Sequence, residues 1–180
     1  MNRRQVLRLS AAAASVLLLS GHTPYGQWVV YRKKHLLVGC HKADPVTYDL
    51  AKQVVAQFEV HLPAAKSRVA RAPTAGRLAS LLGTEQMDVA ILSPADAVAM
   101  MHGTGHFKAY GEIALRTLMP VDGRILIARA DFPERHAWLV SDALAESDLV
   151  PTLKRPFDTE IPWHPGSLAF LEGKSEPVDG

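Results

Sequence analysis

The sequence predicts an α/β fold: a single lobe in which a mainly parallel sheet lies between two layers of helices. Three runs of strand length, at residues 35–40, 67–72 and 87–92, alternate with three stretches of helical periodicity. This alternation is typical of parallel strands joined by right-handed crossovers. The chain has 180 residues, of which 48% are hydrophobic, so it can form the core of one compact domain but would be short for two.

The first helix is predicted from its start and its period. Asp44 is a favourable N-cap residue, and Pro45 stands at the first helical position, where its missing N–H costs nothing. The helix should end near residues 61–63, where a proline follows. Its apolar positions recur every four residues, at Val46, Leu50, Val54 and Phe58.

Two shorter helices follow the second and third strands. One should begin at Pro73-Thr74 and end at Gly83, because glycine commonly closes a helix. The other should begin at Ser93 and run through Met101. Each helix therefore starts directly after a strand of the predicted parallel sheet.

The second half of the chain is less regular. Apolar runs at 114–119 and 124–130 flank a turn signal at 120–123, which predicts two further strands. A helix should follow residues 131–133, a last short helix should cover 166–171, and residues 173–180 are expected to be disordered. The single lobe is thus expected to span residues 35–172. Side chains expected to face inward from the first of these helices are Trp138, Leu139, Ala143 and Leu144.

The N-terminus resembles a twin-arginine export signal. Arg3 and Arg4 precede a run without charges at 9–20, which is shorter than the roughly 20 residues of a membrane span. We therefore expect a signal at 1–22, a linker at 23–34, a periplasmic location and contact with the twin-arginine export machinery. No Ala-x-Ala cleavage site precedes the linker, so the segment could remain as a membrane tether.

Charge and cysteine content narrow the classes of function. Without the three arginines of the signal, 17 basic residues face 18 acidic ones, and no basic run is longer than residues 32–34. Nucleic-acid binding is therefore not expected. Cys40 is the only cysteine, which excludes an internal disulfide, and we expect it to be a small buried hydrophobic residue.

Helix starts at the carboxyl ends of parallel strands form a common ligand crevice. If the sheet is parallel, the crevice would be a binding site for an anion or a partner. Asp44, Thr74 and Ser93 have an alternative role as ordinary helix caps. The candidate binding residues are Lys42, Thr47, Thr74, Ser93 and Asp96.

Other chemistry has less support. His102 and His106, near Met100 and Met101, have ligand types that suit copper, but the glycines between the histidines favour a loop. His164 is expected to orient a turn beside Pro165. No nucleophile, base and orienting group form a recognisable set, so we expect no enzyme activity, no cofactor and no metal.

Four segments together resemble the TAXI solute-binding proteins of tripartite ATP-independent periplasmic transporters. They are residues 38–48, 74–96, 115–120 and 163–168, the last reading Trp-His-Pro-Gly-Ser-Leu. The resemblance implies a lobe like those of type 2 periplasmic binding proteins, a small anionic solute such as a carboxylate, and transporter membrane subunits as partners.

The chain also departs from that family. Residues 124–130 lead almost directly into 131–134, so the second lobe that members insert here is expected to be missing, and residues 41–43 replace a glycine turn. Two functions follow as expectations. One is weak binding of a solute by a single lobe. The other is an accessory or assembly module that docks on a redox enzyme or membrane complex through the former ligand face.

Overall fold

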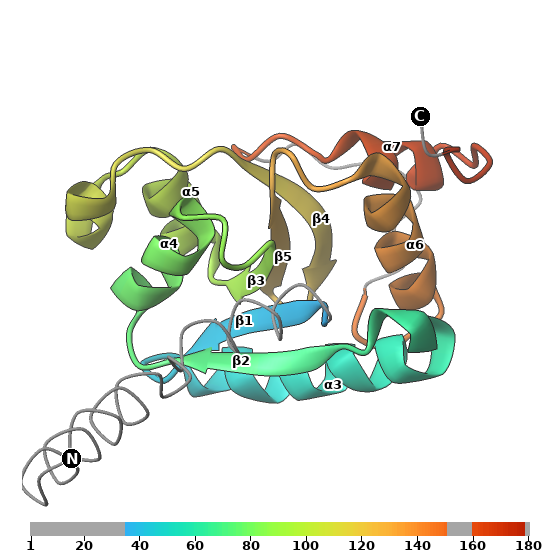
Figure 1. Cartoon of the computed structure of the whole chain (residues 1–180), viewed down its shortest axis with the longest axis horizontal. Helices are drawn as coiled ribbons and strands as arrows, with labels where there is room; N and C mark the ends of the chain where they lie inside the picture. The colour runs from blue at the N-terminus through green and yellow to red at the C-terminus, as the bar shows by residue number, and fades with distance from the viewer. Residues whose placement is uncertain (1–34, 151–159, 179–180) are drawn as a thin grey trace, which may run out of the picture. The chain divides into compact units, whose positions relative to one another are not determined.

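The computed structural model describes residues 35–150 and 160–178, and it confirms the α/β fold class and the single lobe (Figure 1). Within these residues, three strands and three α-helices alternate up to α5, and two strands and two α-helices follow, as the sequence predicts. In chain order, the elements are β1 (Leu37–His41), α3 (Pro45–His61), η1 (Pro63–Ala65), β2 (Arg68–Ala72), α4 (Ala75–Gly83), β3 (Val89–Leu92), α5 (Pro94–Met101), η2 (Gly105–Tyr110), β4 (Leu115–Val121), β5 (Arg124–Arg129), α6 (Glu134–Ala145) and α7 (Pro165–Leu171).

The strands form one sheet in the order β2-β1-β3-β5-β4. β1 pairs in parallel with both β2 and β3, whereas β5 is antiparallel to both of its neighbours. Four strands consequently run in one direction and only β5 runs against them. The sheet is therefore mixed, with its parallel half formed by the three strands that precede α3, α4 and α5.

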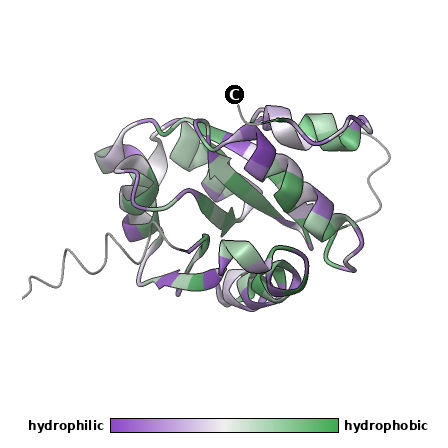
Figure 2. Ribbon diagram, turned by 45° about the vertical axis from the view of Figure 1, so that its right-hand side comes forward, coloured by the Kyte–Doolittle hydropathy of each residue, from purple (hydrophilic) through white to green (hydrophobic). Residues whose placement is uncertain are grey.

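Each face of the sheet has its own hydrophobic core, because successive strand side chains point to opposite faces. Val38 and Cys40 of β1 join the core under α3 and α6, while Leu37 joins the core under α4 and α5. These two cores make the lobe a three-layer structure. Figure 2 shows the central strands as the most hydrophobic elements, with helices of mixed hydropathy around them.

All three predicted helix caps are confirmed. Asp44 accepts a hydrogen bond from the Val46 N–H, Thr74 accepts one from the Arg77 N–H, and Ser93 accepts one from the Asp96 N–H. In α3, Leu50, Val54 and Phe58 are buried as expected. Val46 differs, because it is 45% exposed although the next residue, Thr47, is fully buried.

The end of β1 differs from the prediction, because the strand continues through His41, which the sequence places in the following loop. α4 ends at Gly83, as predicted. The left-handed residue after the helix is Glu85, with φ 58°, rather than the glycine.

The hairpin between β4 and β5 turns at Asp122 and Gly123, whose φ values of 42° and 72° match a tight two-residue turn. Pro120 lies in β4 rather than in the turn. β4 is an edge strand with a register shift between Thr117 and Met119, and an edge position can accommodate a residue without an N–H.

α6 presents a different face to the core from the one expected. Trp138 and Leu139 are only half-buried, whereas Ala137, Val140 and Ser141 are buried beside Ala143 and Leu144. Trp138 instead packs edge-on against Phe170 of α7, at 5.5 Å between ring centroids. The prediction failed there because it assumed one buried side, while α6 packs on both the sheet and α7.

The segment after α7, where the sequence predicts disorder, contacts α6. Trp138 Nε1 donates a hydrogen bond to the Lys174 carbonyl, and Arg135 pairs with Glu176. The expected signal and linker lie outside the described residues. Within the described part of the chain, no helix is both long and apolar enough to cross a membrane.

Candidate functional site

A crevice of about 600 Å³ lies at the carboxyl ends of the parallel strands, where the sequence predicts one. It is formed by the end of β1, the loop into α3, the start of α4, the first turn of α5 and η2. Its volume falls within the range of small-molecule sites. The lining residues are His41, Ala43, Asp44, Thr74, Ala75, Gly76, Asp96 and His106.

Thr74 and Asp96 are the two candidate residues that line this crevice, and Lys42, Thr47 and Ser93 are not among its lining residues. Thr47 is fully buried, and its hydroxyl donates to the Asp44 carbonyl at 2.7 Å, so it is unavailable to a ligand. Lys42 is exposed in the loop after β1. Ser93 contributes indirectly, because its hydroxyl donates to Asp96 Oδ2 at 3.0 Å.

The start of α4 gives the crevice a wall of backbone donors. Thr74 Oγ1 accepts from the Arg77 N–H at 3.1 Å, but the N–H groups of Ala75 and Gly76 precede the first intrahelical bond. Both residues line the crevice. Such a helix start carries a partial positive charge and favours an anionic group nearby. Capping and ligand binding are therefore compatible at Thr74.

Asp44 is neutralised by an arginine from the β4–β5 hairpin. Arg124 Nε lies 2.9 Å from Asp44 Oδ2, and the two side chains are 26% and 16% exposed. Burial by itself raises the pKa of Asp44. Hydrogen bonds from Arg124 and from the backbone of Thr47 and Val46 outweigh it and hold the pKa below its ordinary value. Asp44 therefore stays ionised and paired, and repels an anion little.

Asp96 is the second carboxylate of the crevice. Its oxygens accept from the Ser93 hydroxyl and lie 3.6 Å from His106 Nε2. His106 is exposed and its ring contacts that of the buried Phe107 at a tilt of 41°, with 4.0 Å between ring centroids. The crevice thus offers both a cationic helix start and a carboxylate, which suits a polar ligand.

His41 is one of the six lining residues that sequence reasoning did not propose as binding residues. It is 3% exposed, and neither ring nitrogen has a hydrogen-bond partner among the described residues. Because side chains alternate between the two faces along β1, His41 lies on the same face as Leu37 and Gly39. This is the face of the sheet that α4 covers. If the predicted strand had been one residue longer, its alternation would have placed His41 on this face. That alternation was the signal in the sequence that could have identified His41.

Two residues singled out from the sequence have other roles. Cys40 is fully buried, and burial raises the pKa of its thiol to about 11, with Arg71 opposing the shift. His164 Nε2 contacts the Phe132 carbonyl at 2.8 Å, and its Nδ1 accepts from the Gly166 N–H. His164 therefore orients the turn into α7, as expected.

The loop that carries His102 and His106 does not have the arrangement of a metal site. Met100 is buried in the core under α4 and α5, while His102 is exposed at the end of α5. Gly103 has φ 58° and lies against the Gly111 backbone, so the loop needs a residue without a side chain at this position. Among the described residues, no group of three or more His, Cys, Asp and Glu side chains is placed to hold a metal ion.

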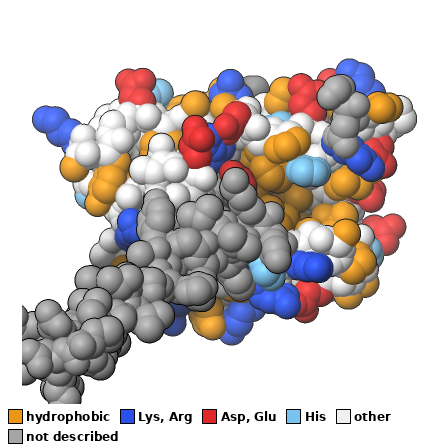
Figure 3. Space-filling model, viewed as in Figure 1, with side chains coloured by type: hydrophobic (Ala, Val, Ile, Leu, Met, Phe, Trp, Pro, Cys, Tyr) orange, Lys and Arg blue, Asp and Glu red, His pale blue; other side chains and the backbone are white. Residues whose placement is uncertain are grey.

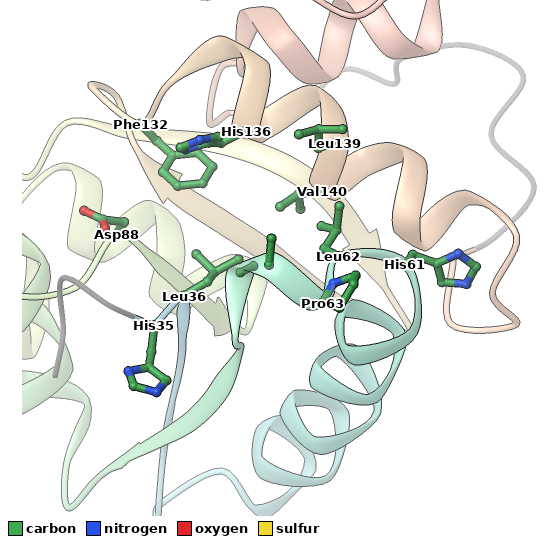
Figure 4. A pocket seen from close by; sticks show the side chains of 12 residues that line it. His35, Leu36, His61, Leu62, Pro63, Asp88, Phe132, His136, Leu139 and Val140 are labelled. Atoms are coloured by element: carbon green, nitrogen blue, oxygen red, sulfur yellow. The ribbon is translucent and has the colours of Figure 1, made fainter.

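A second cavity, of about 540 Å³, lies away from the predicted crevice, beside the end of α3 and the start of α6. Hydrophobic side chains gather in this region of the surface (Figure 3). In Figure 4, Phe132 and His136 lie on one side and Leu36 and Leu62 on another, while His35 and His61 point outward. The lining combines apolar residues with three histidines and Asp88, from segments far apart in sequence, so no motif could have predicted it.

No protein-family profile matches the chain, and no curated protein matches it.

Proposed function

We propose that this chain is an exported, non-catalytic binding protein of the TAXI type, reduced to one lobe, that holds a small anionic solute weakly in the crevice described above. The supporting observation is the crevice itself: three helix starts and the ends of the parallel strands converge on one hollow of ligand size. The resemblance of four sequence segments to TAXI proteins supports the same function and suggests transporter membrane subunits as partners.

The charge of the crevice is compatible with a small carboxylate. Arg124 neutralises Asp44, and the first-turn residues Ala75 and Gly76 of α4 line the crevice. Asp96 adds a negative charge, which favours a solute that carries a donor as well as an anionic group. A single lobe leaves much of such a ligand in water, so the affinity should be low.

A steric block tests where the solute binds. Ala43 is exposed and lines the crevice, whereas Ala64 is exposed and lines the second cavity. We expect Ala43→Trp to abolish binding of dicarboxylates, amino acids and short keto acids in calorimetric titrations, and Ala64→Trp to leave it unchanged. Loss of binding in Ala64→Trp alone would move the function to the second cavity.

Export is tested separately from binding. Replacing Arg3 and Arg4 with lysine should leave the protein in the cytoplasmic fraction, because the twin-arginine pathway depends on this pair. Unchanged delivery to the periplasm would overturn the export proposal and leave the binding proposal standing.

A second candidate function, an accessory module that docks on a redox enzyme or membrane complex, is favoured by one observation. Val46 and Tyr110 are large hydrophobic side chains that are 45% and 43% exposed. Val46 follows Asp44 closely, and Tyr110 lies against Gly76, so both are near the crevice. Exposed apolar residues around a hollow are typical of an interface.

Substitution of those two residues separates the functions. Val46→Lys with Tyr110→Lys should abolish co-purification of a partner complex while leaving solute titrations unchanged. Val60→Lys is the matched control, because Val60 lies farther along α3 and is 73% exposed. Equal recovery of the partner with the double variant would exclude docking through this rim.

A further inference from the structure

His41 lines the crevice, and both nitrogens of its buried imidazole lack a partner among the described residues. Each nitrogen has less than 1 Å² of accessible surface and no hydrogen-bond partner among the described residues. Leaving a buried polar group without a partner costs stability, and the great majority of such groups in native proteins are paired. His41 thus has hydrogen-bonding capacity that the protein's own described groups leave unused.

The surroundings of His41 indicate what could use that capacity. Ala75 and Gly76, in the first turn of α4, line the same crevice, and their N–H groups precede the first intrahelical hydrogen bond. The α4 start favours negative charge, and a neutral imidazole has one N–H that can donate to an oxygen. Asp44, the nearer carboxylate in sequence, is paired with Arg124.

We infer that His41 is a specificity-determining residue of the crevice, and that it binds a small oxyanion jointly with the first-turn N–H groups of α4. The inference rests on the proposed function, because it takes the same crevice as the binding site, and it adds the residue that selects the ligand. Carboxylate and phosphate oxygens both fit this chemistry, so the experiment treats them separately.

Replacing His41 gives two readouts that a structural histidine would not give together. His41→Leu removes the unpaired group, so the melting temperature should rise by about 2 to 6 °C in the absence of ligand. The same variant should bind oxyanions at least about ten-fold more weakly, because a hydrogen bond to a charged group is lost. His41→Gln retains a donor and should restore part of the affinity.

The probes are acetate, L-lactate and inorganic phosphate, with acetamide as the uncharged counterpart of acetate. Binding is followed through the nitrogen-15 resonances of the histidine rings, with His106→Gln to assign the other imidazole of the crevice. We expect the anions to shift the His41 resonances and acetamide to have little effect. A response to phosphate alone would identify a phosphate site, and a response to the carboxylates alone would identify a carboxylate site.

Three results would overturn the inference, and they differ in what they leave standing. If an oxyanion binds the wild type, is blocked by Ala43→Trp, and binds His41→Leu equally well, the crevice binds solute but His41 does not select it. If none of these probes nor the solutes named above binds the wild type at millimolar concentration, the proposed function fails together with this inference. A fall in the melting temperature of His41→Leu would show that His41 is a structural residue.

Discussion

Cys40 illustrates at the residue scale how burial decides reactivity. The thiol is fully buried in β1, and this burial raises its pKa to about 11 against a smaller opposing effect of Arg71. At pH 8 only about 0.1% would be thiolate, the reactive form. We expect Ellman's reagent to modify the folded protein orders of magnitude more slowly than the protein in guanidinium chloride. Equal rates in the two conditions would contradict the buried position.

His164 gives the protein a predicted dependence on pH. Burial lowers its pKa below the ordinary 6.5, although the Phe132 carbonyl opposes the shift. The unfolded chain therefore takes up a proton more readily than the folded one. The contribution of His164 to the stability of the fold is present above pH 6.5 and is lost as the pH falls through the lower pKa that His164 has in the folded protein.

We expect the free energy of unfolding, measured with urea from pH 7.5 down to 5, to decrease below pH 6.5. His164→Gln keeps a donor and an acceptor but cannot gain a proton, so its decrease should be smaller. A variant with the same slope as the wild type would assign the pH dependence to other groups.

The local sequence predicted the structural roles of some residues but not the position of His41. The burial of Cys40, the turn at His164 and the three caps follow from local sequence, because each depends on a small, local environment. His41 was missed for a physical reason. Whether a strand side chain faces a core or a crevice depends on where the strand ends and on what packs beside it, and neither is a local property.

At the element scale, the contact between α6 and α7 depends on a glycine. A Cβ at Gly166 would overlap the carbonyl oxygen of Glu134, which is a backbone atom of α6 and cannot move aside cheaply. Next to it, the Ser141 and Ser167 hydroxyls hydrogen-bond at 2.9 Å. The two helices therefore approach closely at this point.

Gly166→Ala should lower the free energy of unfolding by about 1 to 3 kcal/mol, as overpacking typically does. Gly83→Ala is the control: its Cβ would meet Ile113 Cδ1 at an ordinary 3.5 Å, and alanine favours the helix by about 0.5 to 1 kcal/mol. Urea denaturation of both variants measures the difference. A Gly166→Ala variant as stable as Gly83→Ala would contradict the close helix contact.

The order of elements could be predicted, but their pairing in the sheet could not. Apolar period and capping residues identify α3, α4 and α5 because these signals lie within each helix. The antiparallel insertion of β5 between β3 and β4 depends on contacts between distant residues. Arg129, for example, donates from the end of β5 to the Leu82 carbonyl at 2.8 Å, 47 positions away in sequence.

At the scale of the whole molecule, the proposed function requires a single lobe to hold a ligand without a second lobe to close over it. The predicted crevice exists at the carboxyl ends of β1, β2 and β3, and two of the five candidate residues line it. Lys42, Thr47 and Ser93 follow the right strands but are turned to solvent, to their own helix or to a cap. A crevice open to water gives its ligand less burial, and the entropic cost of association is unchanged.

The most direct test of the account is calorimetric titration of the purified protein with dicarboxylates, amino acids and short keto acids. We predict binding of at least one of them to the monomer in roughly the high-micromolar to millimolar range, or about 4 to 6 kcal/mol, and loss of that binding in Ala43→Trp. A submicromolar dissociation constant for the monomer, or binding that Ala43→Trp leaves intact, would contradict solute binding by a single open lobe.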